Sequence, residues 1–224
     1  MDVEPRSNRR LGAWLGFVAV FAALAYSGNA ADADDDLAEP LYEAEFFVAS
    51  TIGFLILAGA AFLVAIGLDR RWAFALGRPS SWAKALGIAF LVFVAVLIAG
   101  GILGQFVDPA EEQGLLPETW PPPSTAIFAL NAASIVVGAA VAEELLFRGI
   151  GYTLLQRFGT PVAVVGSAVA WAAAHGLVAG FPLIFVFGIG LGLLRRYTGS
   201  AVPGILVHGV FNAFALAVAA ISAA

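Results

Sequence analysis

TAIFALNAASIVVGAAVAEELLFRGIGYTLLQ (residues 125–156) is almost entirely apolar, yet it carries Glu143, Glu144 and Arg148. An apolar segment of this length is typical of a helix that crosses a lipid bilayer, which needs about 20 residues at a rise of ~1.5 Å per residue. Charged side chains are costly to bury at the depth of a bilayer, so they mark a functional site by default. The stretch therefore predicts a membrane helix that takes part in chemistry.

The rest of the chain has the same character. Hydrophobic residues make up 61% of it, charged residues 12%, and the mean hydropathy is +0.92. We therefore predict an all-α, polytopic membrane helix bundle of about seven transmembrane helices. Residues 1–124 are expected to form an N-terminal membrane region with three of these helices, and residues 125–221 a domain with four. The predicted spans are 11–26, 46–68, 86–106, 125–156, 161–177, 181–194 and 202–221.

Basic residues between the spans predict the orientation, because cytoplasmic loops carry an excess of Lys and Arg. The loops at residues 27–45 and 107–123 hold eleven carboxylates and no basic residue. The N-terminus is therefore expected in the cytoplasm and the C-terminus outside. The net charge of −5 arises in these outer loops, so it indicates no nucleic-acid partner. Outside the charged motif, the basic residues lie at 6, 9, 10, 70, 71, 78, 84, 157, 195 and 196.

The first span has a second interpretation. Arginines, a short apolar run and Ala31-Asp32-Ala33 together resemble a signal peptide with a small-residue cleavage site. Cleavage there would leave the orientation of the later spans unchanged.

Further along, Trp72, Phe74 and Trp82 lie among basic and small residues, and residues 71–85 are expected to form an interfacial helix at the inner face. The chain has no cysteine, which excludes disulfides, thiolate metal sites and a cysteine nucleophile.

The charged motif itself suggests a division of roles. On a helix, residues four apart share a face, so Glu144 and Arg148 are expected to pair while Glu143 points elsewhere. A carboxylate in apolar surroundings becomes more basic, which suits a general base near neutral pH. The alternative is a buried structural cluster of two acids around one arginine.

Both histidines of the chain, His175 and His208, fall inside predicted spans. Trp171 lies four residues before His175 and is expected to pack against its ring. Asn212 lies four residues after His208, where its amide can orient the imidazole or donate to an oxyanion. A single intramembrane histidine is often only an interhelical hydrogen bond, but two of them together with Glu143 favour chemistry.

The turns between the last four spans give an estimate of height. Glu143 and His175 lie equally far from the inner turn between their helices, so they are expected to be level. His208 lies about nine residues from the next inner turn, which would leave it ~10 Å lower if the helices are straight. A tilt, a break at Gly149 or Gly151, or a raised inner turn would close that gap. A low position of His208 would favour access from the cytoplasm or the inner leaflet.

Three motifs, which follow one another along the last four spans, resemble the CPBP intramembrane protease family. This family includes the type II CAAX prenyl endopeptidases and bacteriocin-processing or immunity-linked bacterial proteins. The resemblance covers about residues 125–214, and residue 171 departs from it, because the family usually has Phe where this chain has Trp. The motifs are Glu143-Glu144-x-x-x-Arg148, aromatic-x-x-x-His175 and His208-x-x-x-Asn212.

The resemblance implies an intramembrane endopeptidase, of the type named for CAAX-box protein processing, that cleaves a membrane-anchored or lipidated peptide or protein with a glutamate-activated water. Carried over to this sequence, Glu143 would be the general base. His175 and His208 would position the water or stabilise the oxyanion, and Asn212 would complete the oxyanion site. Substrate identity, including whether it is prenylated, does not follow from the sequence. The short loops and small size suggest a prokaryotic plasma membrane.

The family has been described both as metalloproteases and as glutamate proteases without a catalytic metal. Glu143, His175 and His208 could bind zinc or another divalent metal in principle. The chain has no His-Glu-x-x-His motif, and the argument for Glu143 as a base needs no metal, so the metal-free mechanism is favoured. The resemblance further implies that Glu144 and Arg148 hold the helix in place.

Two other classes of protein would also bury such residues. A transporter would place Glu, Arg and His inside a bundle, but it typically shows inverted repeats or broken helices in matching positions, and the sequence has no such symmetry. A non-catalytic membrane scaffold or bacteriocin-immunity protein could use the same fold. Loss of function in Glu143→Ala with normal folding would favour the enzyme over the scaffold.

Overall fold

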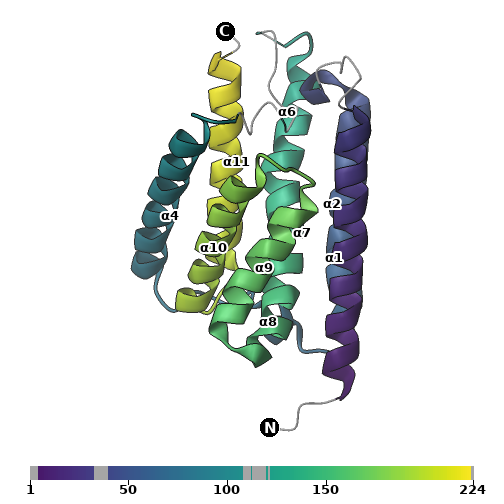
Figure 1. Cartoon of the computed structure of the whole chain (residues 1–224), viewed down its shortest axis with the longest axis vertical. Helices are drawn as coiled ribbons and strands as arrows, with labels where there is room; N and C mark the ends of the chain where they lie inside the picture. Colours follow the sequence, from purple (N-terminus) through teal and green to yellow (C-terminus); the bar gives the residue numbers. More distant parts are fainter. Residues whose placement is uncertain (1–4, 33–39, 108–111, 113–119, 121, 223–224) are drawn as a thin grey trace.

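The structure is a computed structural model that describes residues 5–32, 40–107, 112, 120 and 122–222. Every regular element in these residues is a helix, and the long helices run roughly parallel to one another as a bundle (Figure 1). The predicted all-α class is confirmed. The elements are α1 (Pro5–Asp32), η1 (Pro40–Tyr42), α2 (Ala44–Val64), α3 (Arg70–Phe74), α4 (Trp82–Leu103), α6 (Thr125–Ala133), η2 (Ser134–Ala139), α7 (Ala140–Glu144), η3 (Leu145–Gly151), α8 (Tyr152–Leu155), η4 (Gln156–Phe158), α9 (Thr160–Ala174), α10 (Phe181–Thr198) and α11 (Val202–Ser222).

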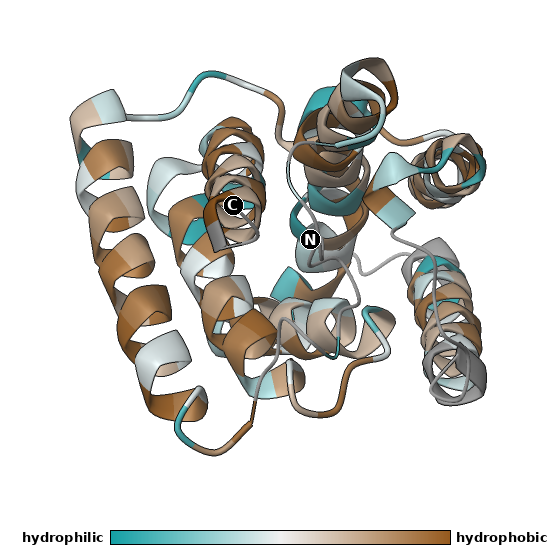
Figure 2. Ribbon diagram, turned by 90° about the horizontal axis from the view of Figure 1, so that it is seen from above, coloured by the Kyte–Doolittle hydropathy of each residue, from teal (hydrophilic) through white to brown (hydrophobic). Residues whose placement is uncertain are grey.

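Among the described residues, six helices are long and apolar enough to cross a membrane, and Figure 2 shows hydrophobic residues along the helices of the bundle. Many large apolar side chains of these helices are exposed. The elements from α6 to η4 form one of these, a single run over Thr125–Phe158. The fifth predicted span, 161–177, is shorter than expected, since α9 has 15 residues and ends at Ala174. It ends there because Gly176 has a φ of +69°, a left-handed conformation that glycine adopts without strain.

The predicted interfacial helix over residues 71–85 is wrong. Its only helical part before α4 is α3, a helix of five residues capped by the carboxylate of Asp69, which accepts from the amide of Trp72. Ala75 then turns into a left-handed conformation at φ 49°, and Pro79 follows shortly after. Both features stop a helix, because a left-handed residue breaks the hydrogen-bond ladder and proline has no N–H. Phe74 is buried, whereas Trp72 and Trp82 remain exposed.

The proposed signal-peptide cleavage motif ends at Ala33, which lies outside the described residues. The described part of α1 continues to Asp32. Residues 33–39 of the first acidic loop and residues 108–111, 113–119 and 121 of the second also lie outside the described residues. Cleavage and the orientation of the termini therefore stay predictions.

The long run from α6 to η4 forms the centre of the bundle. Helix α2 packs against η2, α7 and η3, and α11 packs against η2 and α7. Helix α10 packs against α9 and α4, and α1 packs against α9 and α2. Two stretches of the central run, η2 and η3, are π-helical. Such wider turns are frequent at functional sites, and here they lie on either side of the short α7 that carries both glutamates.

Candidate active site

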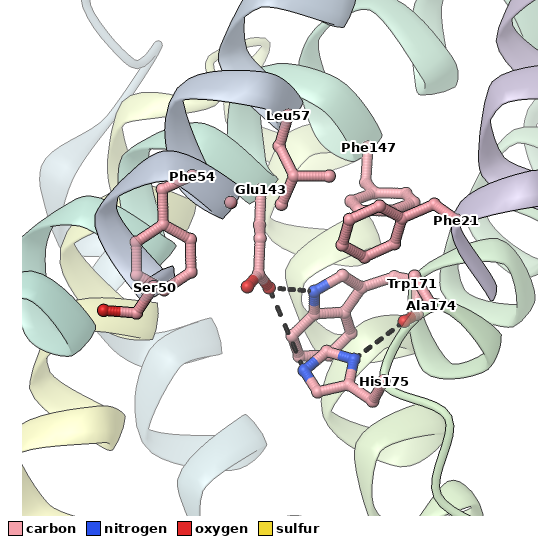
Figure 3. A pocket seen from close by; sticks show the side chains of 10 residues that line it. Phe21, Ser50, Phe54, Leu57, Glu143, Phe147, Trp171, Ala174 and His175 are labelled. Carbon is pink, nitrogen blue, oxygen red and sulfur yellow. Dashed lines mark hydrogen bonds and ion pairs between the residues drawn. The ribbon is translucent and has the colours of Figure 1, made fainter. Parts of the chain in front are cut away.

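Glu143 projects from α7 toward side chains of α9 and α11. Its Oε2 accepts a short hydrogen bond of 2.5 Å from the indole Nε1 of Trp171. The same oxygen lies 4.0 Å from Nε2 of His175 and 3.9 Å from Nε2 of His208. Figure 3 shows the indole and the His175 imidazole both directed at this carboxylate. The structure thus brings together four side chains that the sequence placed on three separate spans.

His208 is level with Glu143, not lower. In Figure 1 the turn between α10 and α11 lies nearer the middle of the bundle than the turn between α8 and α9. The segment after α3 supports this raised turn, because Ser200 Oγ donates to the Gly77 carbonyl at 2.6 Å and the Ala201 amide donates to the Ala75 carbonyl at 2.9 Å. A raised inner turn is therefore the feature that closes the gap. The expectation of access from the inner side loses its basis, because it rested on a low His208.

Glu144 and Arg148 form a fully buried ion pair, with 2.9 Å between Oε1 and Nη1. Nη2 of Arg148 also donates to the carbonyl of Gly188 on α10 at 3.1 Å. The guanidinium carbon lies 4.4 Å from the centre of the Trp171 ring, a cation–π contact. One arginine thus joins the central helix, α10 and the residue that bonds Glu143.

Glu144 also faces α11. Its Oε1 lies 3.5 Å from Nδ1 of His208, an ion-pair distance without hydrogen-bond geometry. Its Oε2 has no hydrogen-bond partner among the described residues, and a Cβ on Gly204 would lie only 2.7 Å from it. Only glycine allows α11 to approach the carboxylate this closely, since any side chain would meet Oε2.

The hydrogen bonds of His175 determine its tautomer. Its Nδ1 lies 2.9 Å from the carbonyl of Trp171, and a carbonyl oxygen only accepts. Nδ1 therefore carries the proton, and in the neutral ring Nε2 presents its lone pair toward Glu143. Trp171 is edge-on to both imidazoles, at 5.0 Å from the ring of His175 and 5.3 Å from that of His208. The predicted packing of Trp171 on His175 is present, and the indole N–H adds a bond that spacing alone did not indicate.

Asn212 bonds to the central helix. Its Nδ2 donates to the carbonyl of Ile135 in η2 at 3.1 Å, which ties α11 to the run that carries Glu143. This bond positions the turn of α11 that bears His208. The predicted contribution of Asn212 to an oxyanion site stays a prediction.

The described residues do not fit a metal centre. No group of three His, Asp or Glu side chains among them is arranged to hold a metal ion. The oxygen of Glu143 that faces both imidazoles already accepts from the indole N–H of Trp171. We therefore derive no step through a metal.

A cavity of about 250 Å³ opens beside Glu143 and His175 (Figure 3). Its walls come from α1, α2, the central run and α9. The α1 and α2 residues were not predicted from the motifs, although Ser50-Thr51 and Gly53 are a polar and small cluster within an apolar span, which is a usable signal. The lining residues are Phe21, Ser50, Gly53, Phe54, Leu57, Glu143, Phe147, Trp171, Ala174 and His175.

The fold and this cluster define a class: a helical membrane protein with a buried carboxylate, two imidazoles and an adjoining cavity. Comparison with protein families agrees with the resemblance noted in the sequence. Residues 125–214 match the family described as Type II CAAX prenyl endopeptidase Rce1-like. The matched segment includes every motif residue named above. No curated protein and no solved structure matches the chain.

Proposed function

We propose that this protein is an intramembrane endopeptidase that cleaves a membrane-anchored or lipidated peptide with a water activated by Glu143. The observation that carries the proposal is the convergence of Glu143 Oε2 with the Nε2 atoms of His175 and His208 at 4.0 and 3.9 Å. These gaps are too long for direct hydrogen bonds and leave room for a bridging water. The family match over residues 125–214 supports the same reaction class.

In the proposed mechanism, Glu143 removes a proton from the water as it attacks the peptide carbonyl. The hydroxide forms the new C–O bond, and the carbonyl becomes an oxyanion. His175 and His208, when protonated, and Asn212 are the donors proposed to stabilise that charge. Glu143 then gives its proton to the leaving amine as the C–N bond breaks.

The surrounding charges favour this use of the carboxylates. Arg148 neutralises Glu144 within a fully buried pair. Glu143 carries one negative charge when ionised, so Glu143 and the two imidazoles together are neutral when they hold one added proton. These three groups can then pass that proton to a substrate and take it back. Glu144 and Arg148 are proposed as positioning residues, because they reach the reacting atoms only through His208 and Trp171.

We further propose that the N-terminus is cytoplasmic, because the basic residues flank one set of helix ends. The natural chain has no cysteine, so single Ser7→Cys and Ala224→Cys variants can be labelled with a membrane-impermeant maleimide in intact cells. Labelling at residue 224 alone supports this orientation, and labelling at residue 7 alone contradicts it.

The reaction is tested with the purified protein and a library of membrane-anchored and lipidated peptides. Wild type and Glu143→Gln are compared, each with and without a strong chelator. Product from wild type that is lost in Glu143→Gln supports the proposal, and insensitivity to the chelator supports the metal-free mechanism. Equal product from both proteins would overturn the assignment of Glu143.

A further inference from the structure

We propose that the cavity beside Glu143 binds one apolar side chain of the substrate next to the cleaved bond, and that α1 and α2 determine its size. This inference rests on the proposed function and deepens it, because it names the substrate class. That class is a membrane-embedded peptide with an aliphatic or aromatic residue adjoining the scissile bond. The walls of this subsite lie partly outside the segment that matches the protease family.

The position of the cavity makes it a subsite of the reaction. Glu143, Trp171 and His175 form one of its walls, so a group bound in it lies beside the carboxylate proposed to activate water. In Figure 3, Phe54 and Leu57 of α2 and Phe21 of α1 lie around the same space. A substrate that places a side chain there brings its backbone to the catalytic groups.

The volume of about 250 Å³ selects the size of the group. Pockets for drug-sized ligands measure about 300–1,000 Å³. This cavity is below that range, and it is much larger than the ~30 Å³ that one water occupies in the liquid. One large side chain fits this volume better than a long lipid chain does.

The lining selects the chemistry of the group. Apart from the catalytic wall, the surface consists of aromatic and aliphatic side chains and two small residues, and Ser50 carries the only hydroxyl among the described lining residues. Ser50 Oγ donates to the carbonyl of Phe47 at 3.2 Å and lies 3.3 Å from Oγ of Ser134. Its one donor is thus used within the protein. Away from the catalytic wall, an acidic substrate side chain would find no free hydrogen-bond donor, and burying it would be costly.

The walls on the far side from Glu143 belong to the N-terminal helices. Phe21 lies in the second half of α1 and stacks on Phe17 at 6.0 Å between ring centres. Gly53, Phe54 and Leu57 lie along α2, which packs against α7. Since residues 125–214 carry the catalytic motifs, the N-terminal helices are free to differ in what they admit without altering the chemistry.

Gly53 allows a direct test of this assignment. A Cβ built at Gly53 meets no atom within 4 Å, so a larger side chain projects into open space. Gly59 lies on the same helix and is equally open, but it lines a different cavity. Gly53→Leu should therefore fill the subsite without disturbing the fold, and Gly59→Leu is its matched control.

The first experiment measures kcat/KM for a series of membrane-anchored peptides. The peptides differ only at the residues that flank the cleaved bond, where they carry Ala, Leu, Phe or Asp. We expect wild type to cleave the Leu and Phe peptides best and the Asp peptide least. In Gly53→Leu, the ratio of kcat/KM for Phe over Ala should fall roughly tenfold or more, the scale of discrimination by one or two methylenes. Gly59→Leu should keep the wild-type ratio. An unchanged ratio in Gly53→Leu would overturn the inference.

The second experiment needs no activity. The chain has no cysteine, so Gly53→Cys introduces a single thiol, and it is combined with Glu143→Gln. This double variant is mixed with a peptide that has cysteine in place of the apolar residue beside the cleaved bond, and an oxidant is added. A disulfide requires the two Cα atoms to approach within about 7 Å. We expect a cross-link in this variant and none in Gly59→Cys with Glu143→Gln.

The two experiments fail separately. A cross-link at residue 53 together with no cleavage by wild type would reject the proposed function and keep the subsite. Cleavage by wild type together with no cross-link at residue 53 would reject the subsite and keep the proposed function.

Discussion

The indole of Trp171 on α9 and the carboxylate of Glu143 on α7 meet through a hydrogen bond of 2.5 Å between Nε1 and Oε2. This bond orients the oxygen that faces both imidazoles. It also distinguishes this chain from the family it resembles, which usually has Phe at this position and so lacks the donor.

Trp171→Phe should lower kcat/KM by roughly ten- to hundredfold without abolishing cleavage. The ring contacts of Trp171 with the imidazoles survive in Phe, but the hydrogen bond to the carboxylate is lost, and such charge-assisted bonds contribute about 1.5–3 kcal/mol. The measurement is steady-state cleavage of one optimised peptide. The bond itself is tested by NMR of the ¹⁵N-labelled indole groups. The signal of Trp171 is the one that is missing from the spectrum of Trp171→Phe. This signal should shift in Glu143→Gln relative to the wild type. An indole signal that is the same with Glu143 and with Gln would contradict the bond.

Arg148→Met should unfold or strongly destabilise the protein, by about 3–5 kcal/mol, because it leaves the fully buried Glu144 without its counter-charge. Adding Glu144→Gln to Arg148→Met should restore much of that stability. Thermal unfolding in detergent measures both variants. The account of the pair fails if Arg148→Met is as stable as the wild type, or if the second change makes it worse.

Gly204→Ala should destabilise the protein by about 1–3 kcal/mol, the usual cost of overpacking. Its Cβ would lie 2.7 Å from Oε2 of Glu144, so the start of α11 has to move away. Since the same helix carries His208, cleavage should fall as well. Gly87→Ala on α4 is the control, because a Cβ there meets no atom within 4 Å. Equal stability of the two variants would show that α11 does not depend on this close approach.

Glu112 gives a pH dependence of stability at the α9–α10 connection. Partial burial raises its pKa, but hydrogen bonds from the backbone amides of Gly180, Val178 and Ala179 outweigh burial and hold the pKa below its usual range. The Gly180 amide donates to Oε2 of Glu112 at 2.7 Å, and the Val178 amide donates to Oε1 at 2.6 Å. A carboxyl group whose pKa is lowered in the folded state stabilises the protein at pH values above its unfolded-state pKa of about 4.3. This stabilisation is lost as the pH falls through the folded-state pKa.

Glu112→Gln should therefore lower the unfolding temperature at pH 7, and lower it by less at pH 3. Thermal unfolding of both proteins between these values tests the sign. A difference that grows as the pH falls would contradict this role of Glu112.

Much of the fold follows from hydropathy alone. Apolar runs of about 20 residues give the spans, because the bilayer fixes the length of a helix that crosses it. The end of α9 depended on the left-handed Gly176, and the end of α3 on the left-handed Ala75. Local backbone conformations of this kind leave only a weak trace in a hydropathy pattern.

The site was predictable where spacing on one helix decides a contact. Glu144 and Arg148 pair as expected from a separation of four residues. The level of His208 was not predictable, because it depends on a turn held up by the backbone of Gly77 and Ala75 from a distant segment. The cavity walls on α1 and α2 were missed for the same reason, since contacts between helices far apart in the sequence follow from packing and not from spacing.

The central claim is that water activated by Glu143 breaks a peptide bond. Its most direct test is cleavage of one membrane-anchored peptide in H₂¹⁸O by wild type and by Glu143→Gln, with the products read by mass spectrometry. We predict one ¹⁸O atom in the new carboxylate formed by wild type, and a loss of product of at least about a thousandfold in Glu143→Gln, in the range of catalytic groups that act together. Undiminished product from Glu143→Gln, or product without ¹⁸O, would contradict the claim.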